Sequence, residues 1–258
     1  MSLPAYVVDG PAEPAGREAP DAPVLLLGPS LGSTVALWEP QVPVLARNLR
    51  VVRFDLRGHG RSLVPPGPYT VEDLGRDVLE LMDHLGIARA HYAGVSLGGM
   101  IGMWVAANAP ERLERLVLAS TSAHMGGVPQ WNQRIETVRR DGMPALTEGI
   151  LERWFTPGFR TAHPEEVERI RAMLLSCPRE GYAGCAAAVR DMDLRDSLAR
   201  IRAPTLVLYG RHDPSTGAEH AELIARATGA PVVALEAAHL ANVEAEADFT
   251  ATVLDFLT

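Results

Sequence analysis

Six short, almost entirely apolar runs recur along this 258-residue chain, separated by longer stretches with helical periodicity. The runs occupy residues 24–27, 51–54, 90–95, 116–119, 205–209 and 231–235. Strands that are apolar on both faces are typical of parallel sheets covered by helices on both sides. The alternation therefore predicts an α/β fold with a mostly parallel, doubly wound sheet. Residues 6–8 are a candidate antiparallel edge strand.

The clearest helix is expected over residues 70–85. Thr70 and Asp73 resemble a capping box, with Asp in the place of Glu. Apolar side chains recur along one face of this stretch, at Val71, Leu74, Val78, Leu81, Met82 and Leu85. Gly86 is a suitable residue to end the helix, so the segment predicts an amphipathic helix packed on the sheet.

The interval from 123 to 201 interrupts the alternation, because it has helical patterns and no convincing strand. Its apolar stripes predict four short helices. Helices inserted between strands of one sheet would form a lid over the carboxyl ends of the strands, where ligands bind in such folds. We therefore predict a core of residues 1–122 and 202–258, and a helical lid of residues 123–201.

A glycine-flanked serine, Ser96, lies between the run at 90–95 and a helical stretch rich in small residues, in the sequence Gly94-Val95-Ser96-Leu97-Gly98-Gly99. A Cβ on either flanking glycine would collide in a tight strand-to-helix turn, and the serine itself would be strained. The alternative is a glycine-rich turn with a capping serine. The strand before the turn and the helix after it favour a nucleophile elbow that exposes the hydroxyl.

A serine hydroxyl needs a base to take its proton and a third group to orient that base. Asp213 follows the run at 205–209, and His239 follows the run at 231–235. Taken singly, Asp213 before a proline is an ordinary turn residue, and His239 is an ordinary loop histidine. Together they have the residue types, chain order and strand-end positions of a Ser–acid–His triad. The predicted catalytic residues are Ser96, Asp213 and His239.

The loop after the run at 24–27 reads Gly28-Pro29-Ser30-Leu31-Gly32-Ser33. In an elbow-based site, one oxyanion donor comes from this loop and the other from the residue after the serine. We therefore predict an oxyanion hole formed by the N–H groups of Leu31 and Leu97. The alternative for the loop is an ordinary Gly/Pro/Ser turn.

The turn Asp55-Leu56-Arg57-Gly58-His59-Gly60-Arg61-Ser62 also follows an apolar run. Its glycines permit a sharp reversal of the chain. Their spacing does not fit the Gly-x-Gly-x-x-Gly phosphate loop, and no helix starts directly after it. We predict a structural role for this turn, shaping the loops beside the site.

Composition limits the possible partners. The net charge of −8 and the lack of a basic tract argue against nucleic acid. No apolar run is long enough for a membrane span, and no signal peptide is visible, so we expect a soluble cytoplasmic protein. Cys177 and Cys185 lie eight positions apart in a helical stretch, and we expect free thiols on a shared face.

These motifs together resemble the α/β-hydrolase family over essentially the whole chain. The closer resemblance is to the 3-oxoadipate enol-lactone hydrolases. Lid stretches are the most discriminating, namely Trp131-Asn132-Gln133-Arg134-Ile135, Arg153-Trp154-Phe155-Thr156-Pro157 and Glu180-Gly181-Tyr182-Ala183-Gly184-Cys185. One departure is Pro29, where many relatives carry His or Asn before the Ser-Leu-Gly of the oxyanion loop.

The resemblance implies opening of the lactone ring of 3-oxoadipate enol-lactone to 3-oxoadipate, in protocatechuate or catechol breakdown, with no metal or organic cofactor. Such a substrate carries a free carboxylate, which a pocket must neutralise or hydrogen-bond. Arg134 is the candidate for this role, and Trp131 and Trp154 are candidates for the pocket wall. Their alternatives are a solvated helix arginine and tryptophans that pack the lid on the core.

Two other functions fit the same motifs. One is a carboxylesterase or a cofactor-free haloperoxidase-like esterase of the same architecture. The other is a non-catalytic ligand-binding protein with this fold, against which the complete Ser96, Asp213 and His239 set argues. Measuring the turnover of a lactone and of an aryl ester discriminates among the lactonase, the esterase and the non-catalytic protein.

Overall fold

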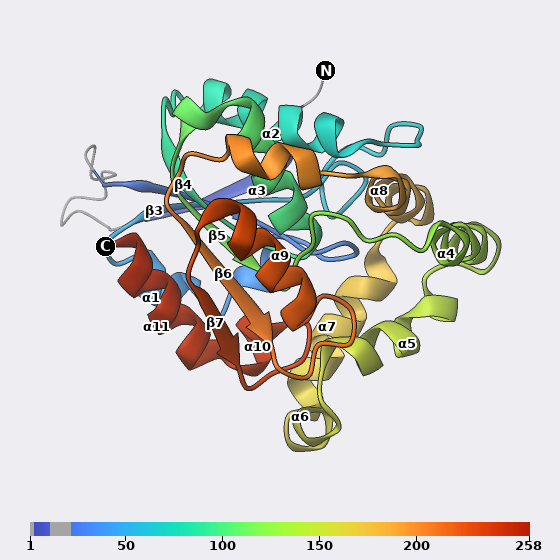
Figure 1. The fold of residues 1–258 in the computed structure, drawn as a ribbon. Helices are drawn as coiled ribbons and strands as arrows, with labels where there is room; N and C mark the ends of the chain where they lie inside the picture. Colours follow the sequence, from blue (N-terminus) through green and yellow to red (C-terminus); the bar gives the residue numbers. More distant parts are fainter. Residues whose placement is uncertain (1–2, 11–21) are drawn as a thin grey trace.

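The computed structural model describes residues 3–10 and 22–258. Seven strands form one sheet in the order β1-β3-β2-β4-β5-β6-β7 (Figure 1). Their bounds are β1 Tyr6–Asp9, β2 Val24–Gly28, β3 Arg50–Phe54, β4 Ala90–Val95, β5 Leu113–Ala119, β6 Thr205–Gly210 and β7 Val232–Leu235. β1 is antiparallel to β3, and all other neighbouring strands are parallel. The predicted α/β fold and its mostly parallel sheet are confirmed.

Helices cover both faces of the sheet. Figure 1 shows α2 (Val71–His84) and α3 (Leu97–Asn108) on one side of it, and α1 (Val42–Leu45) and α11 (Glu246–Leu257) on the other. Leu25, Leu26 and Leu27 of β2 are completely buried, as expected for a strand that lies between two helical layers. α9 (Ala218–Thr228) packs on β6 and β7.

The capping box of α2 forms as predicted. The Thr70 hydroxyl oxygen accepts the Asp73 N–H at 3.0 Å, and the Asp73 carboxylate accepts the Thr70 N–H at 2.9 Å. Both bonds satisfy amides that have no partner inside the helix. Gly86, with a φ of +66°, follows the end of the helix in the left-handed region.

Five α-helices lie between β5 and β6 in the described chain, not the four predicted. They are α4 Val128–Asp141, α5 Pro144–Trp154, α6 Pro157–Ala162, α7 Pro164–Ser176 and α8 Arg179–Asp191. Figure 1 shows them gathered beside the sheet. The sequence pattern did not predict α6, because its six residues, Pro-Gly-Phe-Arg-Thr-Ala, carry no apolar stripe.

α8 approaches the turn after β3 closely, because Gly181 has no side chain: a Cβ there would collide with the Gly58 carbonyl oxygen. The two cysteines are free and buried, but they lie at different elements. Cys177 ends α7 and Cys185 lies within α8, so the shared helical face was a wrong prediction. Pro178 separates the two helices. Within residues 3–10 and 22–258, no helix is both long and apolar enough to cross a membrane.

Candidate active site

Ser96 lies on the sharp turn between β4 and α3. Its φ of +56° and ψ of −118° are strained for a residue with a side chain. A Cβ on Gly94 would meet the Gly98 backbone, and a Cβ on Gly98 would meet the carbonyl oxygen of Gly28. The predicted strand–turn–helix geometry is present, and both glycines are required by contact.

Three hydrogen bonds hold this strained turn. The Ser96 N–H donates to Ala119 O at 2.9 Å, and the Thr121 hydroxyl donates to Ser96 O at 2.7 Å. The buried Tyr92 hydroxyl donates to Gly98 O at 2.8 Å. Groups from β4, β5 and the loop after β5 therefore fix the backbone on both sides of the serine, while its side chain reaches the cavity described below.

His239 and Asp213 follow β7 and β6, whose carboxyl ends lie side by side in the sheet. The imidazole Nδ1 lies 2.8 Å from Asp213 Oδ2. The Thr216 hydroxyl donates to the same carboxylate oxygen at 2.7 Å, and the Ser215 and Thr216 N–H groups donate to Oδ1 at 2.8 and 3.1 Å. The carboxylate is thus held in one orientation against the imidazole.

Burial by itself would raise the pKa of Asp213. The charge of His239, with the hydrogen bonds from His239, Thr216 and the Ser215 N–H, outweighs burial and lowers that pKa to about 2. At neutral pH Asp213 is therefore a carboxylate, which only accepts hydrogen bonds. The proton of a neutral His239 consequently lies on Nδ1, and Nε2 is left as a proton acceptor.

This lowered pKa predicts a contribution of Asp213 to stability. The contribution is complete above about pH 4 and is lost as the pH falls through about 2, because the unfolded chain takes up the proton first. Between those values, wild type should lose about 2 kcal/mol more of its unfolding free energy than Asp213→Asn. Urea unfolding at several acidic pH values measures this, with exposed Asp248→Asn as control. Parallel pH profiles for wild type and Asp213→Asn would contradict the expectation.

The loop after β2 places Leu31 at the same cavity. The Ser33 N–H and hydroxyl both donate to Ser30 O, at 3.1 and 2.7 Å. In a trans peptide, C=O and N–H point in opposite directions, so the Leu31 N–H points away from Ser33. Within the described residues, neither Leu31 N–H nor Leu97 N–H donates to a protein acceptor. Both amides named as oxyanion donors are therefore unengaged.

One cavity brings most of the predicted residues together. It is lined by Ser30, Leu31, Ser96, Met100, Met125, Trp131, Arg134, Arg153, Trp154, Val189, Ser215, Thr216 and His239. Asp213 lies behind His239, and Leu97 is buried next to Ser96. Trp154 stacks on the His239 ring, with centroids 6.4 Å apart and an interplanar angle of 23°. The cavity is therefore shared by strand-end loops of the sheet and by α4, α5 and α8.

Arg134 is held firmly at this cavity. Its Nε donates to the Tyr182 hydroxyl at 2.5 Å, and its guanidinium lies 5.2 Å from the Trp131 ring centroid and 5.4 Å from that of Tyr182. These contacts leave the terminal nitrogens of the guanidinium for a ligand. Trp131 thus contributes a cation–π contact as well as a cavity wall.

Sequence reasoning missed Arg153, which lies on α5 at the rim of the cavity. Burial of part of the side chain, followed by the charge of Arg134, lowers its pKa. No carboxylate of the described residues forms an ion pair with Arg134 or Arg153. The position of Arg153 directly before Trp154, a predicted residue of the pocket wall, was the signal in the sequence that could have identified it. Two cations of the cavity are therefore without an ion-pair partner among the described residues.

Comparisons with known proteins agree with this geometry. The profile of the α/β hydrolase fold matches residues 23–246. 3-Oxoadipate enol-lactonase 2 of Acinetobacter baylyi is 39% identical over 225 residues, which cover 87% of this chain and 84% of that protein. The crystal structure of the enol-lactonase from Burkholderia xenovorans LB400 is 41% identical with a TM-score of 0.93, covering 98% of this chain and 95% of that one.

A third relative, RutD of Stutzerimonas stutzeri, is a proposed carbamate hydrolase. It is 32% identical over 203 residues, covering 77% of each chain. The family match extends over most of the described sheet and over all five inserted helices. The fold, the strained serine turn and these relatives show that this chain belongs to the α/β-hydrolase family.

Proposed function

We propose that this chain is a serine hydrolase that opens the lactone ring of 3-oxoadipate enol-lactone to give 3-oxoadipate. The observation that carries the proposal is one cavity that holds Ser96, the His239–Asp213 pair and two arginines, neither of which pairs with a carboxylate of residues 3–10 and 22–258. Two relatives named enol-lactonases support it. In this proposal Ser96, Asp213 and His239 are the catalytic residues.

In the acylation step, His239 Nε2 takes the proton of Ser96 as its oxygen attacks the lactone carbonyl carbon. The charge that develops on the carbonyl oxygen is received by the N–H groups of Leu31 and Leu97. Each such donor is worth about 3 kcal/mol in the transition state. Asp213 stabilises the imidazolium through Nδ1.

Collapse of the tetrahedral intermediate breaks the ring C–O bond. The leaving group is an enolate that remains tethered to the acyl group, and protonation by the His239 imidazolium converts it to the ketone. Water, deprotonated by His239, then attacks the acyl carbon and releases Ser96. One lactone and one water thus give 3-oxoadipate, with one new carboxylate.

The free carboxylate of the lactone is placed on Arg134, with Trp131 and Trp154 as walls of the pocket. We further propose that residues 123–201, which include the five helices, act as the lid of the core formed by residues 1–122 and 202–258. In this arrangement two local cations receive an anion despite the net charge of −8.

Arg134→Gln is expected to raise KM for the anionic lactone about 10- to 100-fold, because a charge-assisted hydrogen bond is lost, while kcat changes little. Hydrolysis of neutral phenyl acetate should be unaffected. Steady-state kinetics on both substrates measure the separate effects on KM and kcat. Arg226→Gln is the control variant, because it removes one positive charge from α9, outside the cavity, where Arg226 pairs with Glu222. Equal losses on both substrates would contradict carboxylate binding by Arg134.

The relative RutD brings forward a second candidate function, carbamate hydrolysis by the same Ser96 chemistry. Incubation of wild type with the enol-lactone and with a simple carbamate separates the two. The lactonase proposal expects loss of the lactone ultraviolet absorbance and no enzymatic release of ammonia. Rapid ammonia release with an unchanged lactone would replace the lactonase proposal by the carbamate one.

A further inference from the structure

His59 is completely buried in the turn after β3, within Asp55–Ser62, and it contacts the loop that carries Leu31. Its Nε2 accepts the Gly32 N–H at 3.0 Å, and its Nδ1 lies 3.2 Å from Arg57 O. Because an N–H donates to Nε2, the ring proton lies on Nδ1 and donates to Arg57 O. Burial lowers the pKa of His59 to about 4, although the Arg57 carbonyl opposes this, so the ring is neutral at physiological pH.

The bond to Gly32 controls the peptide directly after Leu31. Gly32 has a φ of +85°, in the left-handed region, and its N–H is directed at His59. The peptide directly before Leu31 is fixed by the two bonds from Ser33 to Ser30 O. The Leu31 N–H lies in the peptide before Leu31, and because peptide units are planar the Leu31 backbone can turn only about its own φ and ψ. Holding the following peptide through Gly32 therefore restricts those two rotations and, with them, movement of the peptide that carries the Leu31 N–H.

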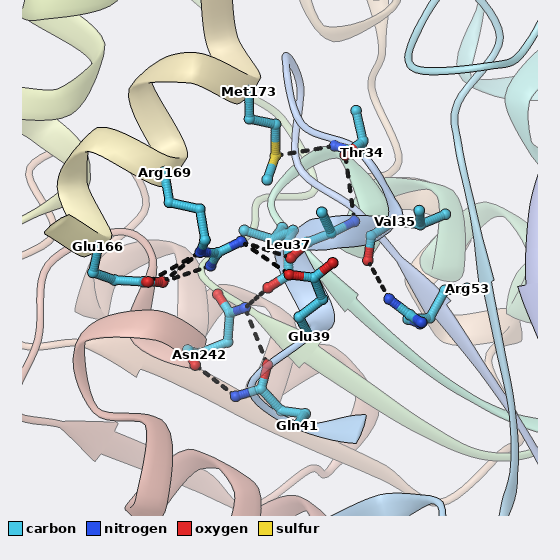
Figure 2. A network of polar contacts seen from close by, with 11 residues as sticks. Thr34, Val35, Leu37, Glu39, Gln41, Arg53, Glu166, Arg169, Met173 and Asn242 are labelled. Carbon is cyan, nitrogen blue, oxygen red and sulfur yellow. Dashed lines mark hydrogen bonds and ion pairs between the residues drawn. The ribbon is translucent and has the colours of Figure 1, made fainter. Parts of the chain in front are cut away.

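The chain beyond this loop is anchored independently, as Figure 2 shows. Met173 of α7 accepts the Thr34 N–H at 3.3 Å, Arg53 of β3 donates to Val35 O at 3.0 Å, and Asn242 donates to Leu37 O at 3.3 Å. These contacts restrain the chain from Thr34 onward. They do not hold the Leu31–Gly32 peptide itself, whose rotation is opposed by the hydrogen bond to His59 and by the side chains packed on Gly32.

That packing comes from the inserted helices. A Cβ on Gly32 would collide with Leu174 of α7 and crowd Tyr182 of α8. Apolar contact at Gly32 fills space but supplies no acceptor for its N–H. A buried amide without an acceptor is costly, so the peptide would turn toward another acceptor or toward water if the imidazole were removed.

We propose that His59 is a positioning residue for the oxyanion hole, acting as a neutral hydrogen-bond acceptor that orients the loop bearing the Leu31 N–H. His59 lies outside the residues that line the cavity, so it acts through Gly32 and not on the substrate. The inference rests on the oxyanion role assigned to Leu31 under the proposed function. It gives the turn Asp55–Ser62, predicted only as structural, a defined part in the reaction.

Two isosteric variants separate positioning from simple filling of space. The side-chain oxygen of His59→Gln can reach the place of Nε2 and accept the Gly32 N–H. The shorter amide of His59→Asn can replace Nδ1 toward Arg57 but leaves Gly32 without its acceptor. On phenyl acetate, His59→Asn should lower kcat about 10- to 100-fold with little change in KM, and His59→Gln should retain most of the wild-type kcat.

Binding of a tetrahedral anion gives a readout that a purely structural role would not move selectively. Phenylboronic acid forms such an adduct with a reactive serine, whereas 3-oxoadipate has only trigonal carbonyl and carboxylate carbons and binds without forming a tetrahedral anion. His59→Asn should weaken boronate affinity by the same factor as kcat and leave 3-oxoadipate affinity unchanged. Rates are divided by the fraction of molecules whose Ser96 reacts with a fluorophosphonate, so that unfolded protein does not lower the apparent kcat. If the His59→Asn variant yields no folded protein, His59→Ala takes its place.

Unchanged kcat and boronate affinity in titrated His59→Asn would overturn the inference, as would parallel losses of boronate and 3-oxoadipate affinity. The failure of the proposed function has a different signature. Wild type would then leave the lactone intact, whatever the His59 variants do on phenyl acetate. The boronate and ester readouts therefore judge His59 independently of the natural substrate.

Discussion

Ser96→Ala is expected to lower kcat by about 10⁵- to 10⁶-fold, on the lactone and on aryl esters alike. The substitution removes the oxygen that attacks the lactone or ester carbonyl in the proposed acylation step. The oxyanion donors and the binding residues remain, so a small residual rate above the uncatalysed reaction should persist. Lactone turnover followed by ultraviolet absorbance measures the loss.

Two controls make this result specific. The affinity for 3-oxoadipate, measured by calorimetry, should stay within about threefold of wild type, because binding energy not used in the transition state is retained. Ser197→Ala, on the 3-10 helix Arg195–Arg200 and outside the cavity, should keep wild-type kinetics. Retention of more than about a hundredth of the wild-type rate by Ser96→Ala would exclude Ser96 as nucleophile.

The second large effect is expected for Asp213→Asn, with a loss in kcat of about 10⁴-fold. An Asn that turns its NH₂ toward His239 donates to Nδ1 and places the ring proton on Nε2. That nitrogen then cannot take the Ser96 proton. The Thr216 hydroxyl also lies 3.2 Å from Nδ1, so it can help to hold the ring in the unreactive tautomer.

Steady-state kinetics of Asp213→Asn test this, with Asp193→Asn as the matched control. Asp193 lies in the segment between α8 and β6 and pairs with exposed Arg195. Its replacement should leave kcat within about twofold, as is usual for an exposed ion pair. A loss below tenfold for Asp213→Asn would show that another group orients His239.

The sheet was predictable because strands buried on both faces need continuous apolar runs, which few other elements require. The carboxyl ends of those strands then placed Ser96, Asp213 and His239 at one edge without any knowledge of long-range contacts. α2 was equally predictable, since its capping box and apolar stripe are local. α6 was missed because its six residues carry no apolar stripe, and the separation of Cys177 from Cys185 was missed because the periodicity did not register the break at Pro178.

Residues that act through tertiary contacts were the harder part of the site. Arg153 reaches the cavity because α5 packs beside α4, and no spacing within either helix reports that packing. The bond from Gly32 to His59 joins residues 27 positions apart on different loops. Sequence therefore indicates the groups proposed to react, whereas the groups proposed to orient them become visible only when the loops are folded together.

The most direct test of the lactonase account is the kcat/KM of wild type for 3-oxoadipate enol-lactone relative to phenyl acetate, with Ser96→Ala measured alongside. The account predicts a ratio of at least about 100 in favour of the lactone, because only the lactone carries an anion for the two arginines. It also predicts loss of both activities in Ser96→Ala. Rapid cleavage of phenyl acetate with no turnover of the lactone would contradict the account and identify a general carboxylesterase.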